Sequence, residues 1–393
     1  MAKKITRKGS KGSTPSSRPL PHRVGAEAML ADLSRIMREQ EFTSLDDAQA
    51  FINRLLDEGG GRLPPSEPES PAERAQALAY QAWEMPTGNE AAALARQAIA
   101  IYSDCTEAYN VLAEADARSV EEACEFYRQG VDAGRRSLGG EFFAENAGHF
   151  WGMIETRPYM RARQGLADCL WAMGRQQDSI AHCEALLELN PDDNQGSRDI
   201  LLSRYLALGN DAGAERLVRQ YKDDRSAAFL WSRVLLDLRR GDEGAAQAAL
   251  ETAMDCNSHV AGFFTGKRKL PAGLPETYGP GDRDEAVLYV VNFAEAWLAS
   301  SDAMEWLVGR LGNSAKRLVL NRRPAAHLFR TDRRSSRGHC LPLHLAVWRF
   351  PKPIFEAAVR GIEGRAPKRF YVASGLSIRK GNRESLLTAW SAR

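Results

Sequence analysis

The stretch RARQGLADCLWAMGRQQDSIAHCEALLELNPDDNQG, residues 161–196, carries apolar residues at the spacing of an amphipathic helix. Gly174 interrupts this pattern, and the Asn190-Pro191 pair ends it one helical hairpin later. Proline cannot continue a helix, because it lacks the backbone N–H donor and its ring clashes with the preceding turn. We therefore predict two helices that are joined by a turn at Gly174.

The same plan recurs along the chain. Gly209 and Gly241 follow Gly174 at intervals of 35 and 32 residues, and each separates one helix-like stretch from a second. The segments around the three glycines are LWAMGRQQDSIAHCEALLELNPDD, YLALGNDAGAERLVRQYKDD and LLDLRRGDEGAAQAALETAMDCNSHV. Upstream, NEAAALARQAIAIYSDCTEAYNVLAEA and SVEEACEFYRQGVDAG indicate two weaker units. We predict about five hairpins between residues 72 and 257.

Such a hairpin cannot bury its apolar face alone, so neighbouring hairpins must stack. Ala167, Ala246 and Ala253 allow two helices to approach closely, while Leu170 and Leu186 fill the space between hairpins. A period of about 34 residues is typical of the tetratricopeptide repeat (TPR). The sequence therefore predicts an all-α fold, namely a TPR-like α-solenoid.

This region resembles the TPR superfamily, and one narrower resemblance rests on four segments. They are GHFWGMIETRPYMRARQGLADCLWAMGR, NPDDNQG, NSHVAGFFTGKRKLP and GDRDEAVLYVVNFAEAWLASSDAMEWL. Together they are similar to bacterial TPR proteins related to the suppression of tumorigenicity seven family, over roughly residues 75–307. The resemblance implies a helical scaffold without a known catalytic centre. Eukaryotic relatives carry N-terminal membrane segments, which are missing here, so we carry over no membrane role.

The sequence predicts five regions: a disordered basic tail (1–24), a helical hairpin (25–57), a linker (58–71), the solenoid with a C-terminal cap (72–310), and an Arg-rich tail (311–393). The apolar stripe of the N-terminal hairpin, which either docks on the solenoid or meets a partner, is Met29, Leu30, Leu33, Ile36 and Met37. In TYGPGDRDEA, we expect a glycine turn followed by Asp282 as a helix N-cap. That helix and AMEWL would form the cap.

Charge is segregated along the chain, although the net charge is only +2. Residues 1–24 carry 7 Lys/Arg and no acid, and residues 311–393 carry 18 Lys/Arg against 4 Asp/Glu. Basic tails bind nucleic acid through phosphate contacts. For residues 311–393 three interpretations remain open: a disordered tail or translated frameshift extension, a nucleic-acid arm, and an accessory domain.

Nothing in the composition predicts secretion, a cofactor or a metal. The N-terminal segment lacks the apolar core of a secretory signal, and the six cysteines show no CxxC pair. We expect a cytoplasmic protein with reduced thiols. Cys169, His182 and Cys183 lack a fourth ligand, so we expect them to pack rather than bind zinc.

In TPR arrays the first helix of each hairpin lines the concave groove, where a peptide or partner helix binds. The groove positions predicted here are Arg161, Gln164, Asp168, Trp171, Arg198, Tyr205, Trp231 and Leu235. Gln164 and Asp168 stand where some TPR domains carry the Lys and Asn that clamp a terminal carboxylate. The sequence therefore disfavours capture of a C-terminal tail.

Catalytic chemistry has weak support. His149 and Glu155 could form an acid/base pair only within one pocket, which their spacing does not show. We expect instead that Trp151 and Tyr159 pack between hairpins and that Glu155 pairs with Arg157. No GxSxG, Walker A or HExxH motif occurs. The preferred hypothesis is a non-catalytic scaffold for a protein or peptide partner. A nucleic-acid-associated protein that uses its basic tails is the alternative, and an enzyme with an unrecognised site comes third.

Overall fold

The computed structural model describes residues 22–38, 40–59, 63–64, 67–271, 273–275 and 277–311. Within these ranges the chain forms α-helices and two short 3-10 helices, η1 and η2, and no β-strand. Only residues 22–24 and 311 of the two predicted tails are described, so the tail predictions lie almost wholly outside these ranges. The elements are α1 (His22–Arg38), α2 (Leu45–Glu58), α3 (Pro71–Trp83), α4 (Gly88–Ile101), α5 (Thr106–Ala115), α6 (Val120–Leu138), α7 (Gly140–Asn146), η1 (Phe150–Gly152), η2 (Ile154–Thr156), α8 (Arg157–Ala172), α9 (Gln176–Leu189), α10 (Ser197–Ala207), α11 (Asp211–Gln220), α12 (Ala227–Arg239), α13 (Glu243–Cys256), α14 (His259–Phe264), α15 (Arg283–Leu298) and α16 (Ser301–Leu311).

The three landmark glycines have the same geometry. Gly174, Gly209 and Gly241 have φ of 76°, 68° and 79°, a region that favours glycine because it has no Cβ. After each glycine, the next backbone N–H donates to a carbonyl five residues earlier: Arg175 to Leu170 at 2.8 Å, Asn210 to Tyr205 at 2.8 Å, and Asp242 to Asp237 at 3.0 Å. This is the bonding of a Schellman C-cap. The predicted turns between α8 and α9, α10 and α11, and α12 and α13 are therefore confirmed.

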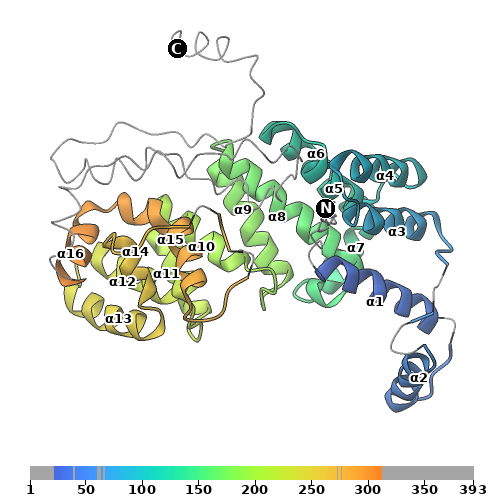
Figure 1. Ribbon diagram of the computed structural model, residues 1–393, viewed down its shortest axis with the longest axis horizontal. Coiled ribbons are helices and arrows are strands. Elements are labelled where there is room, and N and C mark those ends of the chain that lie inside the picture. The colour runs from blue at the N-terminus through green and yellow to red at the C-terminus, as the bar shows by residue number, and fades with distance from the viewer. Residues whose placement is uncertain are drawn as a thin grey trace, which may run out of the picture.

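Each landmark turn joins two helices that pack on one another, as α3–α4 and α5–α6 also do. Small residues allow this close approach. Gly165 on α8 faces the ring of Tyr127 on α6, and Gly134 on α6 faces Tyr159 on α8. Figure 1 shows the pairs following one another along the long axis of the described chain, with α3–α7 at one end, α8 and α9 in the middle, and α10–α16 at the other end.

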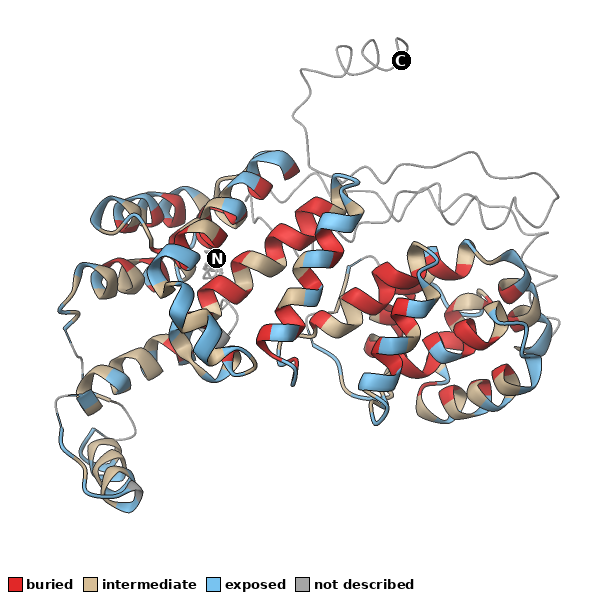
Figure 2. Cartoon of the chain, turned by 180° about the vertical axis from the view of Figure 1, so that it is seen from behind, coloured by how far each residue is buried: buried red, intermediate tan, exposed pale blue. Residues whose placement is uncertain are grey.

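The core is continuous through α8 and α9. One cluster of buried apolar side chains joins α3, α4 and α5, and a second joins α5, α6, α8 and α9. The third runs from α8 and α9 through α10–α15 to α16. The pair α8–α9 therefore contributes to the core on both of its sides. In Figure 2 the buried residues follow the packed faces of these helices, whereas α1 and α2 are mainly intermediate or exposed.

Two segments lie on the first helices of the pairs. Helix α15 packs on α10 and α12, and α1 contacts α3 and η2. The predicted N-cap of α15 is confirmed, because the Asp282 carboxylate accepts the N–H of Glu285 at 2.8 Å. We had expected α15 to cover the end of the last hairpin, but it also lies across first helices from two successive pairs.

Candidate functional site

The predicted groove positions in the C-terminal half belong to the core. Trp231 and Leu235 are 0% exposed, and Tyr205 is 5% exposed. Trp231 lies between the rings of Phe264 on α14 and Tyr289 on α15, whose centroids are 6.5 and 6.4 Å away. These three positions do not line an accessible groove in the described structure. The physical reason is that α14 and α15 of the same chain cover Trp231, while the Tyr205 hydroxyl donates to Glu184 of α9.

The predicted positions on α8 are more accessible, with one exception. Arg161, Gln164 and Trp171 are half-buried, whereas Asp168 is 2% exposed. Asp168 forms an ion pair with Arg204 of α10, which is itself 1% exposed. The guanidinium of Arg204 lies 5.4 Å from the ring centroid of Trp171. Asp168 therefore joins α8 to α10 and is not available to a ligand.

Arg198, the remaining predicted position, is held by its neighbours. Its Nη2 lies 2.8 Å from a carboxylate oxygen of Asp224, and its guanidinium stands 5.1 Å from the ring centroid of Tyr221. Asp193 accepts the backbone N–H groups of Ser197 and Arg198 at 2.7 and 2.8 Å. These two hydrogen bonds stabilise the first turn of α10 and fix the backbone position of Arg198.

A buried polar cluster joins α1 to the first helices of the N-terminal half. We call it the Arg161 network; it consists of Glu27 on α1, Trp83 on α3, Glu107 and Asn110 on α5, and Arg157 and Arg161 on α8. Helix α1 contacts α3 and η2, and it lies below α3 in the view of Figure 1.

Arg161 is the centre of this network, because it binds two carboxylates at once. Its Nη1 donates to Oε1 of Glu27 at 2.9 Å, and its Nη2 lies 2.8 Å from Oε2 of the same side chain. The adjacent edge of the guanidinium, which shares Nη2, donates to Oε2 of Glu107 from Nη2 at 2.8 Å and from Nε at 3.2 Å. Paired N–H donors to one carboxylate give a bond of high geometric specificity.

Glu107 fixes the orientation of Arg161. Its side chain is 0% exposed, and its Oε1 accepts the indole N–H of Trp83 at 2.6 Å. Asn110 donates to Glu107 at 3.1 Å and to the carbonyl of Pro158 at 3.0 Å. These contacts join α3, α5 and α8. Glu107 therefore acts as a built-in counter-ion that holds the guanidinium in place.

Electrostatics keeps the network charged. Burial alone would lower the pKa of Arg161, but the carboxylates of Glu107 and Glu27 outweigh this effect and raise it above its ordinary value. Arg157 adds a second cation, because its Nη1 lies 3.6 Å from Oε1 of Glu27. The two acids and two guanidinium groups balance, so removal of Glu27 would leave one excess positive charge.

Sequence reasoning identified Arg161 but missed Glu27, Trp83, Glu107 and Asn110. Glu27 and Arg161 are 134 positions apart in the chain, and no local pattern connects them. One signal was present: Glu107 interrupts the helical segment CTEAYNVLA at a position that the apolar pattern would bury. An acid at a buried position requires a cationic or hydrogen-bonding partner.

The insert between α6 and α8 is mainly structural. Tyr159 is 1% exposed and packs with Phe150 and Phe143, at centroid distances of 6.3 and 5.0 Å. Trp151 is half-buried, with the Arg157 guanidinium 5.1 Å from its ring centroid. We had expected Arg157 to pair with Glu155, but its carboxylate partner is Glu27, and Glu155 is exposed. The expected pair is replaced because α1 brings a buried carboxylate to Arg157.

The residues considered for acid/base chemistry or metal binding do not form a common site in the described structure. His149 is exposed, like Glu155, so the structure gives this pair no enclosed site. Burial raises the pKa of Cys183 to about 11 and lowers that of His182 to about 4. Cys169 is buried, and burial raises its pKa also. Among the described residues, no cluster of three or more His, Cys, Asp or Glu side chains is placed to hold a metal ion.

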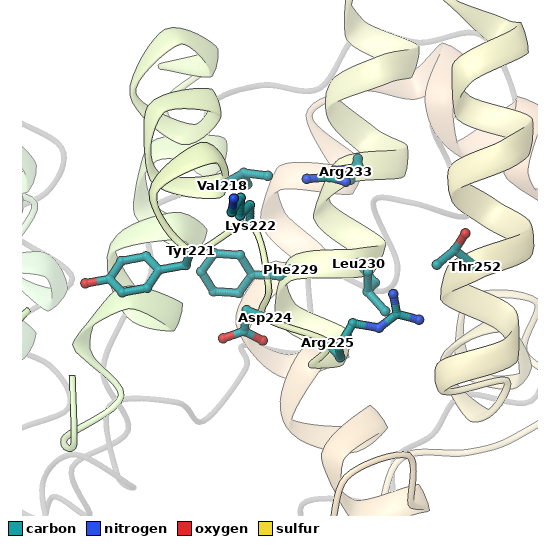
Figure 3. Close-up of a pocket in the computed structure, with 9 residues that line it drawn as sticks. All are labelled: Val218, Tyr221, Lys222, Asp224, Arg225, Phe229, Leu230, Arg233 and Thr252. Carbon is teal, nitrogen blue, oxygen red and sulfur yellow. The ribbon is translucent and has the colours of Figure 1, made fainter. Parts of the chain in front are cut away.

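A pocket of about 240 Å³ opens between α11, α12 and α13. Figure 3 shows Lys222, Arg225 and Arg233 among the side chains that line it. The two hydroxyls in its wall are engaged: that of Tyr221 donates to the carbonyl of Pro191 at 2.8 Å, and that of Thr252 to Ala248 at 3.1 Å. Three cationic side chains and one carboxylate, that of Asp224, therefore line the pocket.

In the part of the chain that the structure describes, no helix combines the length and apolar character needed to cross a bilayer. A comparison of the chain with the sequence models of known protein families finds no match.

Proposed function

We propose that the protein is a non-catalytic TPR-like solenoid that binds a protein partner on the face formed by α3, α5 and α8. Three features support this proposal: the repeated helix–glycine–helix units, their continuous core, and a polar network on the first helices. A scaffold of stacked hairpins presents its first helices as an extended surface for a helix or peptide.

The single observation that carries the proposal is the preorganised guanidinium of Arg161. Glu107 binds it and is itself held by Trp83 and Asn110, while Nη1 of the same guanidinium donates to a carboxylate on a separate helix, Glu27 of α1. The face is therefore built to hold an amphipathic helix through one acidic side chain. The C-terminal face is less suited to this role, because α15 covers Trp231 and Leu235.

The test is capture of a partner by the full chain, followed by reconstitution from purified components. We expect Arg161→Gln to weaken the reconstituted complex at least about thirtyfold, because loss of one member of a buried charge pair costs about 2 kcal/mol or more. Arg135→Gln is the matched control, since Arg135 is exposed on the second helix α6. Its complex should keep the wild-type Kd.

Two results would count against the proposal. One is a partner that binds Arg161→Gln and wild type equally, provided that both chains show the same thermal unfolding midpoint. The other is capture of salt-labile nucleic acid alone, which would favour the alternative based on the basic tails.

A further inference from the structure

Helix α1 has the attributes of a ligand more than those of a core element. Among its residues with described burial, Glu27 alone is buried, at 3% exposed. None of its described side chains belongs to the three apolar core clusters. Helix α15, by contrast, places Tyr289, Phe293 and Trp297 in the core at 0–3% exposed. The chain therefore holds α1 by a different kind of contact.

That contact combines one buried carboxylate with partly covered apolar side chains. Glu27 meets Arg161 and Arg157, and the apolar side chains of Leu30, Leu33 and Met37, which follow at helical spacing, are partly buried but none is fully enclosed. A second link joins Arg38 of α1 to Glu73 of α3, but the Arg38 side chain is 64% exposed. Exposed ion pairs contribute little to stability.

The face beneath α1 does not depend on α1 for its order. Glu107 remains bonded to Trp83 and Asn110, and Asn110 also reaches the carbonyl of Pro158, all within α3, α5 and α8. If α1 leaves, Arg161 keeps the carboxylate of Glu107, whereas Arg157 loses that of Glu27. The excess positive charge on a partly desolvated face favours another carboxylate.

We propose that α1 is an exchangeable internal ligand of the face formed by α3, α5 and α8, and that it closes this face to partners. The partner class is an amphipathic helix with an acidic side chain in the place of Glu27 and apolar residues in the places of Leu30, Leu33 and Met37. This inference rests on the proposed function, for which it defines the chemistry of the partner and adds regulation by competition.

The experiment uses a fluorescent peptide with the sequence of residues 22–38 and measures its binding to full-length chains by anisotropy. Wild type should bind weakly, because its own α1 occupies the face. In Glu27→Arg the new cation opposes Arg157 and Arg161, so α1 is released and the peptide should bind at least tenfold more tightly. A peptide with Glu27→Gln should not bind to the Glu27→Arg chain.

Two further chains complete the test. Met29→Arg introduces the same side chain into α1 at a position that is 49% exposed, so this chain should exclude the peptide as wild type does. Glu27→Arg combined with Arg161→Gln should lose the peptide. Circular dichroism and thermal unfolding verify that each chain is folded, as expected when α1 lies outside the core clusters.

The inference is overturned if the peptide binds the wild-type and Glu27→Arg chains with equal Kd, or binds neither folded chain. Its failure is distinct from failure of the proposed function. Peptide binding without any partner that depends on Arg161 would leave α1 as an internal latch and would reject the scaffold role. A partner that depends on Arg161 and binds wild type and Glu27→Arg equally would reject only the competition.

Discussion

Asp199 on α10 is a half-buried carboxylate in acidic surroundings. Its Oδ1 is buried and has no hydrogen-bond partner in the described structure. Burial raises the pKa of Asp199 from 3.8 to about 7, and the nearby Asp224 adds to this rise, while Arg198 opposes it. Between these two pH values the folded chain retains a proton that the unfolded chain has released. The contribution of Asp199 to the free energy of unfolding therefore falls as pH rises from about 4 to about 7.

Replacement of Asp199 should remove its contribution to the pH dependence of the free energy of unfolding. We expect Asp199→Asn to be more stable than wild type at pH 7.5, because the amide avoids the cost of a buried charge. This advantage in the free energy of unfolding should be about 1 to 3 kcal/mol larger at pH 7.5 than at pH 4.5. Urea unfolding at both pH values measures the difference. Asp223→Asn, at an exposed position nearby, should follow wild type. A gain that is equal at both pH values would show that Asp199 does not titrate in this range.

For single residues, the sequence predicts the position on a helix but not the tertiary partner. Trp231 was correctly placed on a first helix, but the sequence does not tell which segment covers it. A substitution there would remove a fully buried side chain, at a cost of about 3 to 5 kcal/mol, and would therefore test the core rather than binding. Arg161 was identified from its repeat position, whereas its carboxylate partners required the tertiary structure.

At the scale of elements, the contact between α6 and α8 depends on one missing side chain. A Cβ at Gly165 would lie within 2.6 Å of the Cε2 atom of Tyr127. This ring is 3% exposed, and its hydroxyl donates to Glu114 at 3.2 Å, so it has little freedom to move away. Close packing here needs glycine in spite of its lower helix propensity.

We expect Gly165→Ala to lower the free energy of unfolding by about 1 to 3 kcal/mol, because overpacking outweighs the gain in helix propensity. Chemical denaturation measures this loss. Gly309→Ala is the control, since Gly309 lies in α16 and a Cβ there meets nothing within 4 Å. It should be neutral or slightly stabilising. An unchanged denaturation midpoint for Gly165→Ala would mean that the two helices separate easily.

The helices themselves could be predicted because their signals are local. Glycine turns, proline and apolar spacing indicate where α8–α13 begin and end, and Asp282 marks the start of α15. The packing of α15 on α10 and α12 could not be predicted from local signals, because its strongly apolar sequence is equally compatible with a cap on the last hairpin. The sequence predicts that α15 is buried, but only the tertiary contacts show against what.

At the scale of the whole molecule, two helices lie on first helices, and they differ in how they are held. Helix α15 contributes large apolar side chains to the core, and its Glu285 accepts the backbone N–H groups of Ala227 and Gly281 at 2.9 and 2.8 Å. Helix α1 contributes one buried carboxylate. Apolar burial of one large side chain stabilises by about 1.5 to 3 kcal/mol, so α15 should open only with the molecule.

We therefore expect hydrogen exchange to separate the two helices in the wild-type chain. Amides of α15 should exchange as slowly as those of α12, because opening either helix exposes the same core cluster. Amides of α1 should exchange at least a hundredfold faster, since its release breaks one ion-pair network and leaves the clusters intact, a gap of about 2.7 kcal/mol or more. Mass spectrometry of peptides from α1, α12 and α15 measures all three rates in one sample. Equal protection of α1 and α15 would mean that α1 is a permanent part of the fold, and competition at the Arg161 network would then be energetically impossible without unfolding.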